Sequence, residues 1–157
     1  MKNLFLLTLI SILMFSCETT VVEGVELGPA PGYLVSQDGK IDARDADPSN
    51  LAIWEKYMEA HNNKDFETIS TMNHDSIVVN LYDGQNLFGS EAHLNLLKGY
   101  MEEFNPTFNT FFSYTMHVDG QVGDWVITGH QIDQTDNGEK QSLQAVSYTH
   151  LTLPTKA

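Results

Sequence analysis

The stretch NLAIWEKYMEAHNNKDF, residues 50–66, decides the fold. Its apolar, aromatic and histidine side chains recur at steps of three and four residues: Leu51, Trp54, Tyr57, Met58 and His61. This period places them on one face of a helix. Ser49 or Asp47 can cap that helix, and Asn62-Asn63 ends it. Because Asp65 can cap a further helical turn, the stretch predicts a long amphipathic helix followed by a short one.

Helical and strand patterns occupy separate parts of the remaining chain. Residues 76–82 are β-branched and strand-like, and Ser90 opens a third helix that Pro106 prevents from extending. Alternation with a period of two then predicts antiparallel strands over three ranges: 112–118, 125–132 and 139–146. We therefore predict an α+β fold, in which a curved antiparallel sheet wraps on the long N-terminal helix and the last strand or strands are missing.

The first seventeen residues, MKNLFLLTLISILMFSC, have the form of a secretory signal. Lys2 precedes an apolar run over residues 4–15, which is too short to span a bilayer as a helix. The run ends at Cys17, the one cysteine of the chain, and this resembles a bacterial lipoprotein signal. We expect residues 1–16 to be a signal peptide and Cys17 to carry lipid, anchoring the protein in the bacterial cell envelope. The alternative is an ordinary cleaved signal with a chance cysteine.

The segments on either side of the predicted domain, residues 50–145, have a different character. Residues 18–49 lack sustained periodicity and carry seven acidic residues against two basic ones, so we interpret residues 17–49 as an acidic flexible tether. The alternative is that Tyr33-Leu34-Val35 packs on the domain as an additional strand. Residues 146–155, VSYTHLTLPT, resemble a translated sequencing adapter. We expect residues 146–157 to be non-native, with a genuine C-terminal strand as the alternative.

Composition bounds the function. The 157 residues contain 8 Lys plus Arg and 21 Asp plus Glu, a net charge of −13, which is opposite to a basic nucleic-acid surface. A single cysteine excludes an intramolecular disulfide and a multi-cysteine zinc site. The sequence has no HExxH motif, phosphate loop or dinucleotide fingerprint. We therefore expect no metal, no cofactor and no nucleic-acid partner.

Four short motifs, in this order and spacing, carry a family resemblance. They are Trp54-x-x-Tyr57-Met58-Glu59-Ala60, Asn63-Lys64-Asp65-Phe66, Met72-x-x-Asp75-Ser76 and Gly89-Ser90-Glu91. Together they resemble the nuclear transport factor 2-like superfamily, whose cystatin-like cone includes SnoaL-like and ketosteroid-isomerase-like domains. The resemblance covers residues 50–145. It implies a sheet curled around the long helix, with a conical cavity that suits a small hydrophobic molecule.

The resemblance implies which side chains line that cavity. We expect them to be Trp54, Tyr57, Met58, Tyr114, Met116, Trp125 and His130. Successive side chains of a strand point to opposite faces, so a shift of one residue exchanges the two faces. The alternates Thr115 and His117 therefore stay open as lining residues.

A catalytic set is incomplete when the ketosteroid-isomerase pattern is laid on the chain. Tyr57 matches the family's helix tyrosine, but the base position falls on Asn80, which cannot take a proton at neutral pH. The third position falls near Ser147, inside residues 146–157, which we expect to be non-native. Steroid isomerisation is therefore disfavoured. The remaining catalytic candidates are Tyr57, His117 and His130, with Asp119 as a carboxylate that could orient His117.

Three functions from different classes follow. The first is a lipid-anchored envelope domain that binds a small hydrophobic ligand and has no assignable chemistry. The second is a cofactor-free SnoaL-like enzyme, an isomerase, cyclase, dehydratase or hydrolase, that acts on a small hydrophobic substrate. The third is an interaction module that forms a homodimer through the open face of its sheet.

Overall fold

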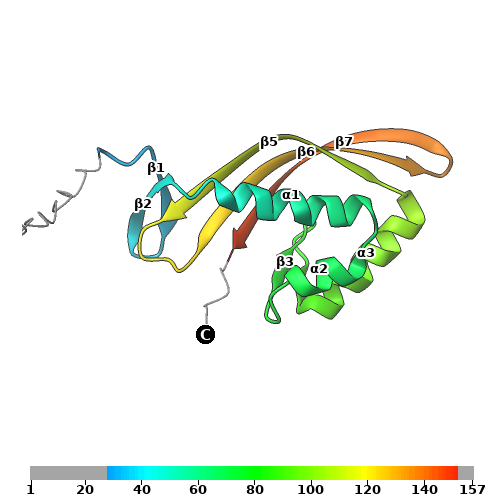
Figure 1. Ribbon diagram of the computed structural model, residues 1–157, viewed down its shortest axis with the longest axis horizontal. Helices are drawn as coiled ribbons and strands as arrows, with labels where there is room; N and C mark the ends of the chain where they lie inside the picture. Colours follow the sequence, from blue (N-terminus) through cyan, green and yellow to red (C-terminus); the bar gives the residue numbers. More distant parts are fainter. Residues whose placement is uncertain (1–27, 152–157) are drawn as a thin grey trace, which may run out of the picture.

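The computed structural model describes residues 28–151, in which the helices precede a run of three long strands, as predicted (Figure 1). The elements in order are β1 (Gly32–Ser36), β2 (Gly39–Asp45), α1 (Ser49–Asn62), α2 (Phe66–Met72), β3 (Val78–Asn80), β4 (Asn86–Phe88), α3 (Ser90–Phe104), β5 (Thr107–Val118), β6 (Asp124–Asp136) and β7 (Glu139–Leu151). The predicted signal peptide and Cys17 lie outside the described residues. The α+β prediction is confirmed.

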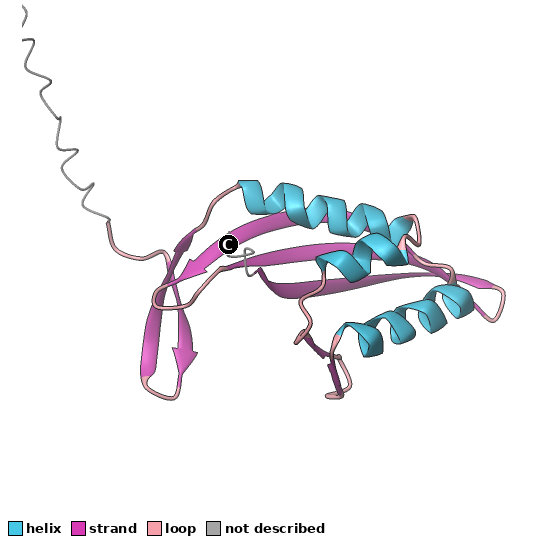
Figure 2. Ribbon diagram, turned by 60° about the horizontal axis from the view of Figure 1, so that its bottom comes forward, coloured by secondary structure: helices cyan, strands magenta, loops and turns pink. Residues whose placement is uncertain are grey.

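The main sheet is antiparallel, and its strands follow the order β1-β2-β5-β6-β7. It is strongly curled, and the helices lie against one of its faces (Figures 1 and 2). We call this the concave face and the opposite one the outer face. Strands β3 and β4 form a separate two-stranded hairpin between α2 and α3.

Local chemistry starts and ends the helices where the sequence predicts. For α1, the start at Ser49 agrees, but the N-cap is Pro48 and no side chain caps it, so the prediction of Ser49 or Asp47 as the cap is wrong. The Asp47 carboxylate accepts the backbone N–H of Ser49 at 2.9 Å from one residue before the N-cap. The Asp65 carboxylate accepts the N–H of Thr68 at 3.0 Å and so caps α2. After α3, Asn105 adopts a left-handed conformation with φ 44° and Pro106 follows, so the chain leaves the helix and enters β5.

The apolar face of α1 packs on the middle of the sheet. Trp54, Met58 and Val126 form a buried cluster, on which Phe108 and Leu151 also pack. A second buried contact joins Ala43 of β2 to its partner Val118 of β5. Burial of apolar surface at these two places holds α1 and the hairpin to the sheet.

Residues 32–45 correct the interpretation of this segment as a tether. They form the β1–β2 hairpin, whose turn has Gly39 at φ 120°, and β2 pairs with the edge of β5 through Ala43↔Val118, Arg44↔His117 and Asp45↔Met116. The alternative of an additional strand at Tyr33-Leu34-Val35 therefore describes the segment correctly. Local periodicity misses the hairpin because its stabilising partner lies more than seventy residues further along the chain.

Residues 146–151 continue β7 along β6, with pairs such as Thr128↔Ser147 and Val126↔Thr149. They occupy the place of the C-terminal strand that the alternative interpretation describes. The resemblance of this stretch to a translated adapter stays a prediction.

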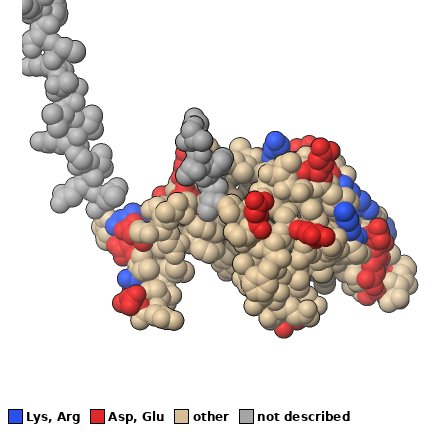
Figure 3. Space-filling model, turned by 90° about the horizontal axis from the view of Figure 1, so that it is seen from below, with Lys and Arg blue, Asp and Glu red and all other residues tan. Residues whose placement is uncertain are grey.

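Two surface findings complete the fold. On the face of residues 28–151 that Figure 3 shows, charged side chains are dispersed, and uncharged residues form most of its centre. Within the same residues, no helix combines the length and the apolar character needed to cross a bilayer.

Candidate functional site

The register of β5 and β6 decides which side chains face α1. Val126 packs on Trp54 and Met58, so the residues that share its face of β6, Thr128 and His130, also lie on the concave face. On β5, Thr115 pairs with Val126 and is buried. A β-bulge between Thr110 and Phe112 inserts one residue and inverts the alternation upstream of it.

Three of the predicted cavity residues lie on the outer face instead. Tyr114 pairs with Ile127 and Met116 pairs with Trp125, both in the opposite set from Val126. Tyr114 is 40% exposed and donates its hydroxyl to Asp45, and Trp125 packs on His150 at 4.8 Å between ring centroids. The prediction that Tyr114, Met116 and Trp125 line the cavity is therefore wrong, because the register is the other of the two alternatives. Thr115 and His117 lie on the concave face.

The other predicted residues do meet on the concave face. Trp54 lies 5.6 Å from Tyr57 and 6.0 Å from His130, between ring centroids. Met58 belongs to the apolar cluster beside them. We call the surrounding polar side chains the concave polar cluster; its members are Trp54, Tyr57, His61, Asn73, His93, Thr128 and His130.

A chain of hydrogen bonds joins the helices within this cluster. The Tyr57 hydroxyl donates to Asn73 Oδ1 at 2.7 Å, and Asn73 Nδ2 donates to Ser90 Oγ at 3.0 Å. Asn73 Nδ2 also lies 3.1 Å from His93 Nδ1. His61 Nδ1 donates to the carbonyl of Tyr57 at 2.8 Å, since a carbonyl can only accept. Asn73 thus connects α1, α2 and α3.

Burial keeps the titratable members of the cluster neutral near pH 7. Desolvation lowers the pKa of His61, His93 and His130, and raises the pKa of Tyr57. For His93 the pKa falls to about 4, with the nearby His61 as a second cause. The cluster therefore presents uncharged donors and acceptors instead of ions.

Three buried polar atoms of the cluster have no hydrogen-bond partner among the described residues: Trp54 Nε1, Thr128 Oγ1 and His130 Nε2. Their residues are 5%, 0% and 3% exposed. The other ring nitrogen of His130 lies 3.2 Å from Thr110 Oγ1. A buried polar group without a partner costs about 1–3 kcal/mol, so three in one place need an explanation.

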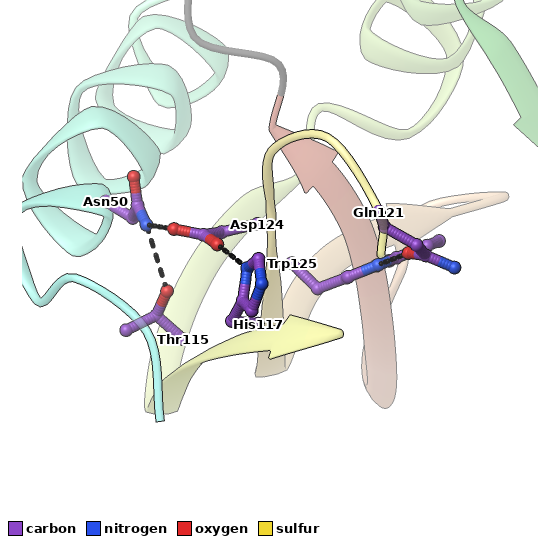
Figure 4. Close-up of polar contacts among 6 residues, drawn as sticks. All are labelled: Asn50, Thr115, His117, Gln121, Asp124 and Trp125. Atoms are coloured by element: carbon purple, nitrogen blue, oxygen red, sulfur yellow. Dashed lines mark hydrogen bonds and ion pairs between the residues drawn. The ribbon is translucent and has the colours of Figure 1, made fainter. Parts of the chain in front are cut away.

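His117 has a different partner from the predicted one. Its Nδ1 lies 2.9 Å from Asp124 Oδ1, and Asp124 Oδ2 accepts from Asn50 Nδ2 at 2.8 Å (Figure 4). Asn50 Nδ2 also reaches Thr115 Oγ1 at 3.2 Å. Asp119 is not the partner because it leaves the strand, donating its backbone N–H to Asp42. Trp125 Nε1 donates to Gln121 Oε1 at 2.8 Å and braces the turn that brings Asp124 to His117.

Sequence reasoning missed several polar residues that the fold brings together. Asn50, Asn73, His93 and Thr128 carry no motif, yet Asn50, His93 and Thr128 are buried. The position at which the family pattern expects a base, Asn80, is exposed on β3. Among residues 28–151, no three His, Cys, Asp or Glu side chains are grouped so as to hold a metal ion.

Comparisons with known proteins bear on the fold. No family model and no curated protein matches the sequence. An LEH-like epoxide hydrolase from M. tuberculosis superimposes with a TM-score of 0.52 at 15% identity, covering 64% of this chain and 71% of that one. A protein described as a SnoaL-like polyketide cyclase, from Shewanella putrefaciens CN-32, gives a TM-score of 0.53 at 16% identity, covering 67% and 71%. The chain has the cone-shaped fold of SnoaL-like, nuclear transport factor 2-like proteins, as its sequence predicts.

Proposed function

We propose that the concave face binds a small, uncharged, hydrophobic molecule through a hydrogen-bond acceptor such as a carbonyl oxygen. The observation that carries the proposal is the group of three unpartnered buried atoms on Trp54, Thr128 and His130. A ligand acceptor placed among them would supply the missing partners and recover the cost of leaving them unpaired.

The chemistry of the three groups selects an acceptor. The Trp54 indole N–H can only donate, and the Thr128 hydroxyl can donate. His130 Nε2 carries the hydrogen when its Nδ1 accepts from the Thr110 hydroxyl. Thr128 and His130 are two residues apart on β6, about 7 Å, and the Trp54 ring lies 6.0 Å from His130. These groups are close enough to serve one small molecule.

The surroundings favour an uncharged ligand. The lowered pKa values of His61, His93 and His130 leave no imidazolium near pH 7 to pair with a carboxylate. An unpaired buried charge is costly, so an anionic ligand is disfavoured. The rings of Trp54, Tyr57 and Phe108 supply apolar walls of the kind that small-molecule sites have.

Thermal denaturation with matched pairs of compounds tests the proposal. Acetophenone against ethylbenzene and 2-decanone against decane differ by a carbonyl group, and we expect only the carbonyl members to raise the Tm. Thr128→Val should weaken their binding about tenfold, the value of one hydrogen bond, whereas Thr135→Val, on an exposed position of β6, should not. Equal shifts within each pair, or no shift, would sink the proposal.

A cofactor-free SnoaL-like enzyme is the second candidate function. The two similar structures described above are named as an epoxide hydrolase and a polyketide cyclase, and Tyr57 and His130 both belong to the concave polar cluster. Turnover of a ligand found in the thermal screen would favour this candidate; stable binding without product would favour the first.

We further propose that the domain is held at a bacterial membrane by lipid on Cys17. The support is the order of Lys2, the apolar run over residues 4–15 and the cysteine that follows it. Labelling of growing cells with an alkyne fatty acid should mark the wild-type protein and not Cys17→Ser. Equal labelling of both proteins would overturn this assignment.

A further inference from the structure

An open groove of about 670 Å³ lies beside the start of α1, away from the concave polar cluster. The charged and titratable residues that line it are Arg44, Asp45, Asp47, His117, Asp119 and Asp124, and Gly28, Pro29 and Pro31 form one wall. Asp124 is four residues from Thr128 on β6, about 13 Å along the strand. The groove is therefore a separate site from the one proposed above.

His117 is held in this groove as an oriented base. Asp124 engages its Nδ1 at 2.9 Å, which fixes the ring and leaves Nε2 without a hydrogen-bond partner among residues 28–151 (Figure 4). The His117 side chain is 41% exposed, whereas that of Asp124 is 19% exposed and is itself fixed by Asn50. In a neutral imidazole, a carboxylate on Nδ1 keeps the hydrogen on that nitrogen and leaves the lone pair on Nε2.

Arg44 is the cross-strand neighbour of His117. The two residues pair in the β2–β5 register, so their side chains share one face with Cβ atoms about 5 Å apart. The Arg44 guanidinium donates to the Gly28 carbonyl at 2.9 Å and to Asp42 at 3.3 Å, and three of its five N–H donors remain. It is the only arginine in the chain.

We propose that this groove hydrolyses small esters, with His117 as general base, Arg44 as the group that stabilises the oxyanion, and Asp124 as a positioning residue. A water molecule attacks the ester carbonyl carbon, and its proton moves to His117 Nε2. Arg44 stabilises the negative charge that forms on the carbonyl oxygen. The carbon–oxygen bond of the ester then breaks, and the proton passes from Nε2 to the leaving alkoxide. The products are a carboxylic acid and an alcohol.

The groove selects the charge of the ester. Asp47, Asp119 and Asp124 line it against a single arginine, so the field at its mouth repels anions. The groove is also open to solvent, which supplies the water that the reaction consumes. Uncharged and cationic esters are therefore the substrates, and esters that carry a carboxylate are poor ones.

Hydrolysis by the full chain of 4-nitrophenyl acetate, acetylcholine and 4-acetoxybenzoate tests the proposal. We expect saturable hydrolysis of the first two, at least tenfold faster than that of the anionic third. His117→Gln should lower kcat about 100-fold. Arg44→Gln should lower it at least tenfold, and Asp124→Asn should lower kcat with KM unchanged.

Matched controls separate catalysis from general imidazole reactivity and from loss of fold. His74→Gln removes an exposed histidine elsewhere, and Lys40→Gln removes a cation of the same hairpin that lies over Tyr33. Both should retain full activity. The Arg44 side chain is 25% exposed and lies outside the apolar cluster under α1, so Arg44→Gln reports on the site even if His117→Gln lowers the Tm. Hydrolysis that does not saturate, or that Arg44→Gln or a folded His117→Gln leaves unchanged, overturns the proposal. Ester hydrolysis and the rise of the Tm with ketones are separate measurements, so failure here is distinguishable from failure of the ligand proposal.

Discussion

Polar side chains are buried at two places along α1, and the two places differ in how well their groups are paired. At the start of the helix, Asn50 joins Asp124 and Thr115 in one connected network. One turn later, Trp54 faces Thr128 and His130, and each of the three has a buried polar atom without a partner. Similar residue types at similar depth thus share hydrogen bonds in one region and leave buried atoms without partners in the other.

The difference indicates what each region is for. A complete buried network fixes its members in one geometry, which suits the orientation of His117 at the surface. An incomplete one lowers the stability of the empty protein and rewards whatever supplies the missing partners. The first region therefore contributes to stability, and the second lowers the stability of the empty protein.

Loss of the Asn50 side chain should have the largest effect on this comparison. Asn50→Ala leaves the Thr115 hydroxyl unpaired and removes a partner from the Asp124 carboxylate, inside a site that is 2% exposed. We expect the free energy of unfolding to fall by about 3 kcal/mol, measured by urea denaturation.

Asn62→Ala is the matched control for this variant. Asn62 lies on the same helix and also makes two hydrogen bonds, to the backbone of Phe108, but it is exposed. Asn62→Ala should lower the free energy of unfolding by less than half as much as Asn50→Ala. Equal decreases in the free energy of unfolding would mean that burial does not strengthen the hydrogen bonds of Asn50.

Acidification should weaken the concave polar cluster selectively. The folded-state pKa values of His61, His93 and His130 lie below the ordinary 6.5, so the unfolded chain takes up protons first as the pH falls. The stability is therefore fully present above pH 6.5 and decreases as the pH falls. Below about pH 4, His93 is protonated in the folded state too, and it causes no further loss. We expect the free energy of unfolding to fall by about 2 kcal/mol across this window. Urea denaturation at a series of pH values measures it.

His93→Gln sharpens this prediction because it removes the histidine with the lowest pKa. The dependence of stability on pH between 6.5 and 4 should become shallower, whereas His74→Gln, at an exposed site, should leave it unchanged. A wild-type stability that stays flat through this window would contradict the assignment of the three histidines as neutral and buried.

The sequence predicts the features that depend on nearby residues and misses those that depend on residues far apart in the chain. The face of α1, the Asp65 cap and the start of α3 at Ser90 depend on neighbours a few residues away, and the sequence predicts them. The faces of β5 depend on a bulge at Phe111 that inverts the alternation, and the hairpin at residues 32–45 depends on a distant strand. His117 finds Asp124 only because β5 and β6 pair, so a search along one strand selects Asp119 instead.

Two buried threonines give the smallest and cleanest test of the opening comparison. Thr115 is 6% exposed and its hydroxyl meets Asn50, whereas Thr128 is 0% exposed and its hydroxyl has no partner among the described residues. Valine replaces the hydroxyl by a methyl group of similar size. Thr115→Val should therefore destabilise the protein by about 1 kcal/mol, and Thr128→Val should stabilise it by a similar amount. Thermal and urea denaturation of both variants give the sign directly. If both changes had the same sign, the Thr128 hydroxyl would have a partner in the empty protein, and the strongest support for a ligand on the concave face would be lost.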